Sequence, residues 1–319
     1  MKVHILDDWF DTLRGLPGFA LLEKHDVTVW TDHTEDVDLL AMRLADAEAL
    51  LLFRERTPIT ATLLARLPNL RLISMRGAYP HVEVDACRRY GITLCSNRAV
   101  GGYSVAAAEL TFALILTIAR QLPQQIASLK AGLWQSGIGQ TLAGRVLGIY
   151  GYGGIGQAVA KYALAFGMTV KVWGSEAGQV RAAADGLIVP DSRKEFFAES
   201  DFVSLHVRLT TETRGIVTAD DLRAMKSSAG FVNTSRSGLI APAALEAALK
   251  AGRPGRIAVD VFDEEPMTDV THPLLNHSSV IATPHIGFVT EDELDQQFRD
   301  IYEQVNAFAK GKPINVVDV

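Results

Sequence analysis

Three side chains with complementary chemistry each follow a strand-like apolar run in the second half of the chain. They are Arg236, Glu265 and His285. The planar fork of an arginine pairs bidentately with a carboxylate, and a histidine can donate a proton near neutral pH. A carboxylate beside the histidine favours the charged imidazolium. The set therefore predicts a site that holds a carboxylic acid and moves a proton on it.

Each of these residues also has an ordinary structural reading when it is taken alone. Arg236 fits a surface charge, Glu265 fits a solvated acidic turn, and His285 fits a hydrogen-bonded core histidine. Their joint placement beyond three strands of one predicted sheet favours the chemical reading, because doubly wound sheets bind ligands at the carboxyl ends of their strands.

A glycine-rich turn with the spacing G-x-G-x-x-G lies earlier in the chain, at Gly151, Gly153 and Gly156. A buried-strand run precedes it, a helix-like segment (157–166) follows it, and a second strand-like run ends at Trp173. That order is one βαβ unit. In such a unit the first glycine permits the turn, the second lets a pyrophosphate approach, and the third lets the helix pack closely. The helix N-terminus attracts phosphate, so the stretch predicts dinucleotide binding rather than a chance cluster of glycines.

The glycine turn and the three side chains together predict the reduction of a 2-keto acid. A bound nicotinamide supplies the hydride, so the protein provides positioning and charge. Arg236 would bind the substrate carboxylate, and His285, kept charged by Glu265, would protonate the developing alkoxide.

The elements that must position these residues alternate between strand-like and helix-like runs, which predicts parallel sheets covered by helices. Strands are expected at 2–6, 27–30, 49–53, 70–75, 92–95, 146–150, 168–173, 186–189, 202–206, 230–233, 257–261 and 280–282. Helices are expected at 19–24, 37–45, 60–66, 84–90, 104–122, 124–133, 157–166, 218–225 behind a capping box, 242–250 with Pro242 in its first turn, and 291–310. A crossover between domains is expected at 97–102.

Composition narrows the class of protein. The chain has 319 residues, enough for two domains. Its 31 basic and 37 acidic residues give a net charge of −6 without blocks of like charge, which argues against a nucleic-acid partner. Cys87 and Cys95 show no metal-ligand spacing, so we expect no metal and a reducing, cytoplasmic location. The apolar run 105–119 is interrupted by Glu109 and is too short for a membrane span.

Five motifs resemble those of the D-isomer-specific 2-hydroxyacid dehydrogenases. They are GYGGIG at 151–156, LHVRLTTETRG at 205–215, FVNTSRSG at 231–238, DVFDEEP at 260–266 and TPHIG at 283–287. Their order and spacing fit nearly the whole chain. The resemblance implies that Arg236 binds the substrate, that His285 is the acid/base and that Glu265 is the partner of His285.

The resemblance also implies an architecture. We expect an α/β protein of two doubly wound parallel-sheet domains, with a Rossmann dinucleotide-binding domain (99–286) inserted into a smaller flavodoxin-like substrate domain (1–98 plus 287–319). It implies a homodimer built on the arm at 104–140. The many apolar side chains of 105–119 agree with that, because a helix that is apolar on more than one face packs on more than one side.

Residues that contact the dinucleotide follow from the resemblance as well. Asp260 would hold the nicotinamide carboxamide, while Gly154, Ile155, Thr234 and the backbone at Val207 would touch the dinucleotide. Substrate capture is implied for the loop at Gly77, Ala78 and Tyr79. That loop keeps Gly77 but lacks the second glycine that is usual there, so Tyr79 either shapes the pocket or caps it. Arg208 stands where the family usually has proline.

Coenzyme choice depends on the end of the strand at Trp173. The common ribose-binding aspartate is missing there, because the position is Gly174. Ser175 can bond a hydroxyl or a phosphate, and Glu176 would repel a 2′-phosphate. The nearest arginine, Arg181, is expected on the next helix and out of reach. The sequence therefore predicts NAD, with NADP possible.

The combined prediction is an NAD(P)-dependent oxidoreductase that acts on a D-2-hydroxy acid or its 2-keto partner. One alternative is an NADPH-dependent glyoxylate or hydroxypyruvate reductase. Another, of a different class, is a dinucleotide-sensing corepressor-like protein, and the presence of all three catalytic residue types argues against it.

Overall fold

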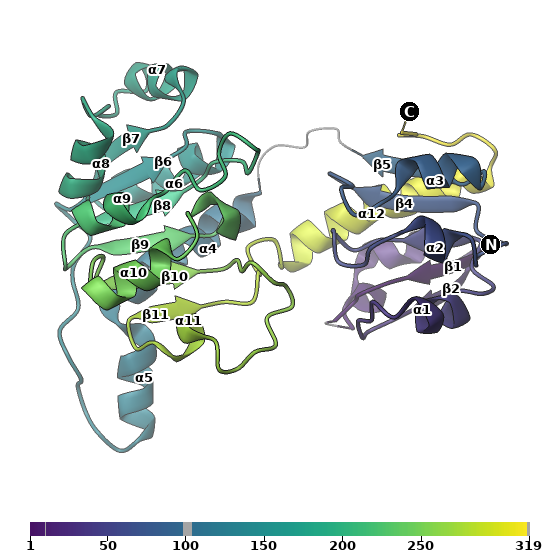
Figure 1. The fold of residues 1–319 in the computed structure, drawn as a ribbon, viewed down its shortest axis with the longest axis horizontal. Coiled ribbons are helices and arrows are strands. Elements are labelled where there is room, and N and C mark those ends of the chain that lie inside the picture. The colour runs from purple at the N-terminus through teal and green to yellow at the C-terminus, as the bar shows by residue number, and fades with distance from the viewer. Residues whose placement is uncertain (10, 98–103, 318–319) are drawn as a thin grey trace. The chain divides into compact units, whose positions relative to one another are not determined.

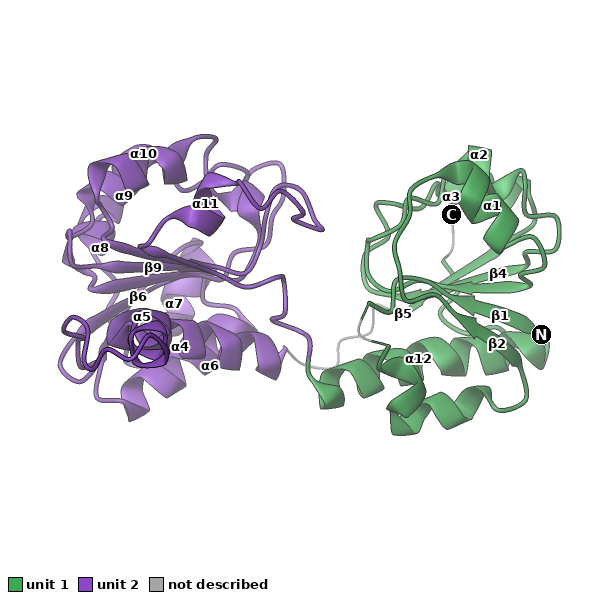
Figure 2. Ribbon diagram, turned by 90° about the horizontal axis from the view of Figure 1, so that it is seen from below, with its two compact units in different colours: residues 1–101, 290–319 green, residues 102–289 purple. Residues whose placement is uncertain are grey.

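The computed structural model describes residues 1–9, 11–97 and 104–317 of the chain (Figure 1). The chain divides into two compact units (Figure 2). Unit 1 comprises residues 1–101 and 290–319, and unit 2 comprises residues 102–289. The predicted crossover at 97–102 lies outside the described residues except for Asn97.

Unit 1 is built on a parallel sheet with the order β2-β1-β3-β4-β5. Its strands are β1 (Lys2–Ile5), β2 (Asp26–Val29), β3 (Ala49–Leu51), β4 (Leu72–Arg76) and β5 (Thr93–Asn97). Because β1 pairs with both β2 and β3, the order reverses at β1, as in flavodoxin-like sheets. Residues of the central strands such as Ile5, Leu50 and Ile73 have no exposed surface.

Helices cover both faces of this sheet (Figure 2). They are α1 (Val37–Arg43), α2 (Ala61–Leu64) and α3 (Val84–Arg89) on one face, and α12 (Glu291–Ala309) on the other with the 3-10 turns η1 (Leu13–Gly15) and η2 (Pro17–Leu22). The expected helix at 19–24 is instead the 3-10 segment η2. Its Gly18 backbone N–H donates to Asp295 of α12 at 2.6 Å, and a Cβ at Gly18 would approach that side chain to 2.8 Å, so close docking on α12 fixes the tighter turn.

Unit 2 is a six-stranded parallel sheet with the order β11-β10-β9-β8-β6-β7. Its strands are β6 (Val146–Tyr150), β7 (Thr169–Trp173), β8 (Phe202–Leu205), β9 (Gly230–Asn233), β10 (Arg256–Val259) and β11 (Val280–Ala282). Its helices are α4 (Val105–Arg120), α5 (Leu122–Lys130), α6 (Gly154–Ala165), α7 (Glu176–Ala184), α8 (Arg193–Glu199), α9 (Ala219–Ala224), α10 (Ala244–Ala251) and α11 (Pro273–Asn276), with a 3-10 turn η3 (Ser237–Leu239). Two parallel sheets with covering helices confirm the predicted α/β class.

The expected strand at 186–189 is wrong. Only Ile188 pairs with the sheet, in a single parallel bridge to Lys171 of β7. Gly186 has a left-handed backbone with φ +77°, and Pro190 follows two residues after Ile188, so the pairing has no room to lengthen. The bridge nevertheless marks the sheet edge where dinucleotide-binding folds place their third strand.

Two expected helix starts also move. The helix after the glycine turn begins at Gly154 rather than at residue 157, so the last three residues of the motif lie in its first turn. The helix after Pro242 begins only at Ala244, because Ala243 has a positive φ of 58°. The predicted capping box of Thr218 and Asp221 is present at the start of α9.

Half of the residues of helix α4 are buried within unit 2, while its expected contact with a second subunit stays a prediction. Phe112, Ile115 and Ile118 join the core cluster beneath the sheet. Exposed apolar side chains lie instead on α5 and just after it. Figure 1 shows α5 extending from the rest of unit 2.

Among the described residues, no single helix is long and apolar enough to cross a membrane. Helices α4 and α5 pass that test only as a pair, by length and composition, and they meet at a bend of 59°.

Candidate active site

The glycine turn lies between β6 and α6, where the sheet order reverses. Gly151 has φ +103°, and a Cβ there would lie 2.6 Å from the His206 carbonyl oxygen. A Cβ at Gly156 would lie 2.3 Å from the Gly151 carbonyl oxygen. By contrast, no atom lies within 4 Å of the Cβ position at Gly153. Packing of the chain itself thus requires a glycine at positions 151 and 156. Gly153, by contrast, leaves open the space that a pyrophosphate needs.

This difference predicts opposite effects of two alanine substitutions. Gly153→Ala should leave the melting temperature unchanged and weaken NADH binding by at least about tenfold, because the new methyl group meets only the ligand. Gly156→Ala should lower the melting temperature, because its Cβ overlaps backbone. Thermal unfolding and calorimetric titration with NADH test both. Equal NADH affinity of Gly153→Ala and the unsubstituted chain would contradict a pyrophosphate site here.

Arg236 follows β9 on a loop that its neighbours fix. The buried Asn233 side chain donates to the Arg236 carbonyl oxygen at 2.9 Å and accepts from the Ser235 backbone N–H at 3.0 Å. Ser237 donates to the Phe262 carbonyl oxygen at 2.9 Å, which ties the loop to the end of β10. The guanidinium of Arg236 is exposed, and among the described residues its one hydrogen bond is to the carbonyl oxygen of its neighbour Ser235, at 2.7 Å.

Glu265 and His285 lie side by side beyond β10 and β11. The Nδ1 atom of His285 is 2.5 Å from Oε2 of Glu265, and Oε1 accepts from the Phe262 backbone N–H at 2.9 Å. The His285 ring also meets the edge of Phe288, with centroids 5.5 Å apart. Because Glu265 engages Nδ1, Nε2 is the ring nitrogen that remains for a substrate oxygen.

Electrostatics keeps the Glu265 carboxylate ionised. Partial burial alone would raise its pKa, but the hydrogen bond and charge of His285, the Phe262 N–H and the charge of Arg236 together hold the pKa of Glu265 below its ordinary value. A permanently charged carboxylate beside the ring stabilises the imidazolium form of a histidine.

Asp260 fixes the segment that carries His285. Its buried carboxylate accepts from the Thr283 hydroxyl at 2.5 Å and from the backbone N–H groups of Ile286 and Gly287 at 2.9 and 2.8 Å. Burial raises the pKa of Asp260, although these hydrogen bonds oppose the shift. Its expected contact with a nicotinamide carboxamide stays a prediction, and the structure adds a positioning role that sequence reasoning missed.

A second histidine lies at the same sheet edge, and its environment is different. Burial lowers the pKa of His206 to about 4, and its Nε2 is 2.8 Å from the Ser204 hydroxyl. It is therefore neutral at neutral pH and cannot act as the proton donor there.

The other expected dinucleotide residues lie around the turn and the neighbouring strand ends. Gly154 and Ile155 form the first turn of α6, and Ser175 caps α7 by accepting from the Gly178 N–H at 3.3 Å. The Thr234 hydroxyl is 2.6 Å from that of Thr111. The Val207 carbonyl oxygen accepts from Ser235 at 2.8 Å.

Arg181, which was expected to lie out of reach of a 2′-phosphate, contacts the glycine turn. Arg181 lies on α7 as expected, but its Nη2 donates to the carbonyl oxygen of Tyr152, between the first two glycines, at 3.1 Å. Spacing along the sequence did not reveal this, because the reach depends on how α7 packs against the turn.

The expected substrate loop at Gly77, Ala78 and Tyr79 belongs to unit 1 and follows β4. Gly77 has φ +95° and donates its backbone N–H to the Asn97 carbonyl oxygen at 3.1 Å, while its own carbonyl accepts from the Ser96 hydroxyl at 2.7 Å. Tyr79 packs against the edge of the unit 1 core.

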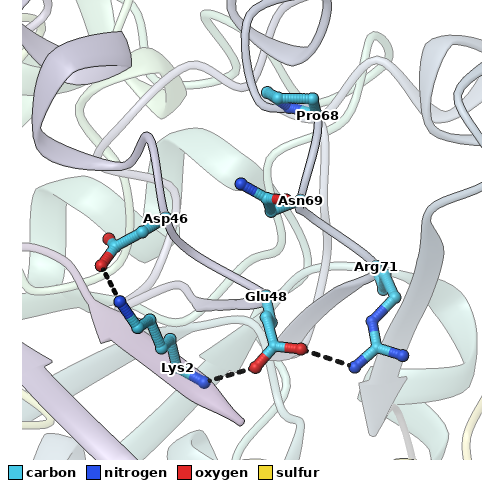
Figure 3. A pocket seen from close by; sticks show the side chains of 6 residues that line it. All are labelled: Lys2, Asp46, Glu48, Pro68, Asn69 and Arg71. Atoms are coloured by element: carbon cyan, nitrogen blue, oxygen red, sulfur yellow. Dashed lines mark hydrogen bonds and ion pairs between the residues drawn. The ribbon is translucent and has the colours of Figure 1, made fainter.

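A hollow of about 450 Å³ in unit 1 lies at the opposite, amino-terminal edge of that sheet (Figure 3). Its charges satisfy one another: Lys2 pairs with Asp46, and Arg71 pairs with Glu48, at 2.7 and 2.8 Å. Because each charge already has a partner, this hollow offers a charged ligand little, and we assign no function to it.

Metal chemistry finds no support in the part of the chain that the structure describes, since no group of three histidine, cysteine or acidic side chains is placed to hold an ion. Cys87 and Cys95 are buried, and burial raises the pKa of each thiol to about 11. They are therefore neutral, unreactive core residues.

Comparison with known proteins decides the family. Residues 112–287 match the model of the D-isomer specific 2-hydroxyacid dehydrogenase family, NAD binding domain. The chain belongs to this family. The motif resemblance is thereby confirmed, and the open turn at Gly153 fits the NAD that such a domain binds.

Relatives within the family extend the likeness over the whole chain. A hydroxypyruvate reductase of Thermotoga maritima is 34% identical over 91% of this chain and 92% of its own length. A D-3-phosphoglycerate dehydrogenase of Methanocaldococcus jannaschii is 36% identical over 92% of this chain, which spans only 55% of that relative's length. The crystal structure of a phosphoglycerate oxidoreductase from Vibrio cholerae o395 is 45% identical, with a TM-score of 0.91 over 98% of this chain and 99% of that one.

Proposed function

We propose that the protein transfers a hydride between NAD(H) and a D-2-hydroxy acid or its 2-keto partner. The observation that carries the proposal is the 2.5 Å contact of His285 with Glu265 beyond β10 and β11, with Arg236 beyond the adjacent strand β9. All three lie at the carboxyl edge of the sheet that also carries the glycine turn, which is the edge where doubly wound sheets bind ligands.

The dinucleotide fits the residues present. The pyrophosphate would lie against the backbone at Gly153, where the chain leaves open space, and against the N-terminal turn of α6. Val207, Thr234 and Asp260 would meet the rest of the molecule along the strand ends. When bound, the reduced nicotinamide supplies the hydride.

Arg236 would bind and orient the substrate. Its exposed guanidinium can form two parallel hydrogen bonds with a carboxylate. The Asn233 and Ser237 contacts hold the backbone beneath it, so the carboxylate would be fixed relative to the neighbouring His285. Because the nicotinamide supplies the hydride, the protein contributes mainly by positioning. Fixed orientation of the substrate is therefore a large part of catalysis.

His285 would supply the proton in the direction of reduction. As the keto carbon accepts the hydride, negative charge develops on the keto oxygen, and the proton on Nε2 neutralises it. The Glu265 carboxylate at Nδ1 stabilises the imidazolium that donates this proton. In the direction of oxidation the neutral ring would take the proton from the hydroxyl group.

The test of this function is consumption of reduced dinucleotide. Purified protein mixed with NADH and a panel of 2-keto acids should oxidise NADH, followed as loss of absorbance at about 340 nm. The panel should include glyoxylate, hydroxypyruvate and its 3-phosphate, because the named relatives act on this class. Tight NADH binding without turnover on any keto acid would instead favour the dinucleotide-sensing alternative.

We further propose a cytoplasmic homodimer. The support for the dimer is an exposed apolar stripe on and after α5, formed by Leu122, Ile126, Leu129, Leu133, Trp134 and Ile138. The first three recur every three or four residues within α5, so they share one helical face. Large exposed apolar patches mark interaction surfaces, and a stripe on a projecting arm suits a second copy of the chain.

The support for the cytoplasmic location is that the two free, buried thiols suit a reducing compartment.

Charging this stripe should separate the subunits. Leu129→Asp should convert a dimer into a monomer in sedimentation velocity at micromolar concentration, because a carboxylate buried at an interface is strongly unfavourable. Val180→Asp, which alters an exposed apolar residue of α7, should leave the dimer intact. A monomer for the unsubstituted chain would contradict the assembly while leaving the proposed reaction unaffected.

A further inference from the structure

The adenosine end of the proposed dinucleotide site lies where β7 ends beside the glycine turn. In this fold the residue after that strand normally bonds the ribose 2′-hydroxyl. Here it is Gly174, with φ +149°, and a Cβ at that position would lie 3.4 Å from Gly151. Residues with side chains rarely adopt this backbone conformation, so no carboxylate at the strand end selects against a 2′-phosphate.

A cation contacts the glycine turn beside this strand end. Arg181 reaches back from α7, and its Nη2 donates to the Tyr152 carbonyl oxygen at 3.1 Å, inside the turn and one residue from Gly151. A guanidinium has five N–H donors, and this is the single contact that Arg181 makes among the described residues. No carboxylate of the described chain lies within ion-pair distance of it, since Asp185 instead accepts from the Tyr152 hydroxyl at 2.8 Å.

Two further residues, Ser175 and Glu176, lie at the adenosine end of the proposed site. The Ser175 hydroxyl accepts from the Gly178 N–H, which leaves its own proton for a ligand oxygen. Glu176 is a carboxylate that opposes a phosphate, and it lies exposed in the first turn of α7, where the helix dipole already stabilises its charge.

We propose that Arg181 enables this site to bind the 2′-phosphate of NADP(H) as well as NAD(H). The inference rests on the proposed dinucleotide site, and it states which coenzymes that site binds. The four remaining donors of Arg181 pair with phosphate oxygens, and charge-assisted bonds of this kind are the strong ones. It replaces the sequence-based expectation that Arg181 lies out of reach of a 2′-phosphate with the proposal that Arg181 neutralises this group.

Direct binding measurements test the proposal without turnover. Calorimetric titration of the whole chain with NADPH and NADH should give dissociation constants within about tenfold of each other. Arg181→Gln keeps an amide donor for the Tyr152 carbonyl but removes the charge, so it should weaken NADPH about 10- to 100-fold and NADH less than about threefold. Titration with 2′,5′-ADP and 5′-ADP should show the same selectivity, because these probes occupy only the adenosine end.

Arg208→Gln provides the matched control. It removes the same charge from the other side of the turn, after β8, and should not discriminate between the two coenzymes. A Glu176→Gln variant should strengthen NADPH alone. NADPH binding more than about 100-fold weaker than NADH in the unsubstituted chain, or equal losses of both coenzymes in Arg181→Gln, would overturn the inference and leave the proposed function standing. Failure of both coenzymes to bind would overturn both.

Discussion

His285→Ala should lower the turnover number for keto-acid reduction by about 10²- to 10⁴-fold, the usual contribution of a positioned general acid. The substitution removes the ring that contacts Glu265 through Nδ1 and that would donate the proton through Nε2. NADH affinity should change little, because the glycine turn is built from other strands. Steady-state NADH oxidation and NADH titration measure the two effects separately.

A second histidine variant makes this prediction specific. His277 lies in the same unit, and its Nδ1 only accepts from the Ser279 backbone N–H. His277→Asn should therefore retain activity. Near-full activity of His285→Ala on the best substrate would show that another group donates the proton, and His206, kept neutral by burial, is not a candidate for it.

The partner carboxylate should appear in the pH dependence. The pKa of Glu265 is lowered, so this side chain remains a carboxylate throughout the neutral range and supports the imidazolium there. Glu265→Gln removes that negative charge from beside Nδ1 of His285. The pH profile of keto-acid reduction should therefore change in this variant, whereas an unchanged profile would show that Glu265 has only a structural role.

Arg236→Ala should lower kcat/KM by about 10³-fold, because it removes two charge-assisted hydrogen bonds worth roughly 1.5–3 kcal/mol each. Both constants should change: KM rises as the carboxylate loses its anchor, and kcat falls as the keto carbon loses its orientation. Initial rates over a range of keto-acid concentrations separate the two constants.

Lysine at the same position distinguishes charge from geometry. Arg236→Lys keeps the positive charge but not the planar fork, so most of the loss should remain. Arg223→Ala is the matched control, since Arg223 is an exposed arginine of α9 that pairs with Asp220 outside the site. Arg236→Ala with an unchanged KM would place the substrate carboxylate elsewhere.

The sequence revealed the elements of this site because strong local signals mark them. Buried parallel strands appear as apolar runs, and the polar residues that follow them must meet at one sheet edge. Arg236, Glu265 and His285 were found in this way. The contacts of Asn233, Ser237 and Asp260 were missed, because the direction of a side chain in a loop depends on tertiary packing that no local pattern encodes.

Packing also explains the errors in the predicted fold. Ile188 forms one bridge instead of a strand because Gly186 and Pro190 limit its pairing. Arg181 reaches the glycine turn because α7 presents that face to Tyr152. In each case the residue type was visible in the sequence, but the surface that it meets was not.

Transfer of a label between the dinucleotide and the substrate tests the central claim most directly. The protein is mixed with NADH doubly deuterated at C4 of the nicotinamide and with the best 2-keto acid, for a single turnover. We expect a 2-hydroxy acid of D configuration that carries one deuterium at C2. Mass spectrometry detects the deuterium, and chiral chromatography determines the configuration. A product without the label would contradict direct hydride transfer in the site formed by Arg236, Glu265 and His285, and a labelled product of L configuration would contradict the proposed D specificity.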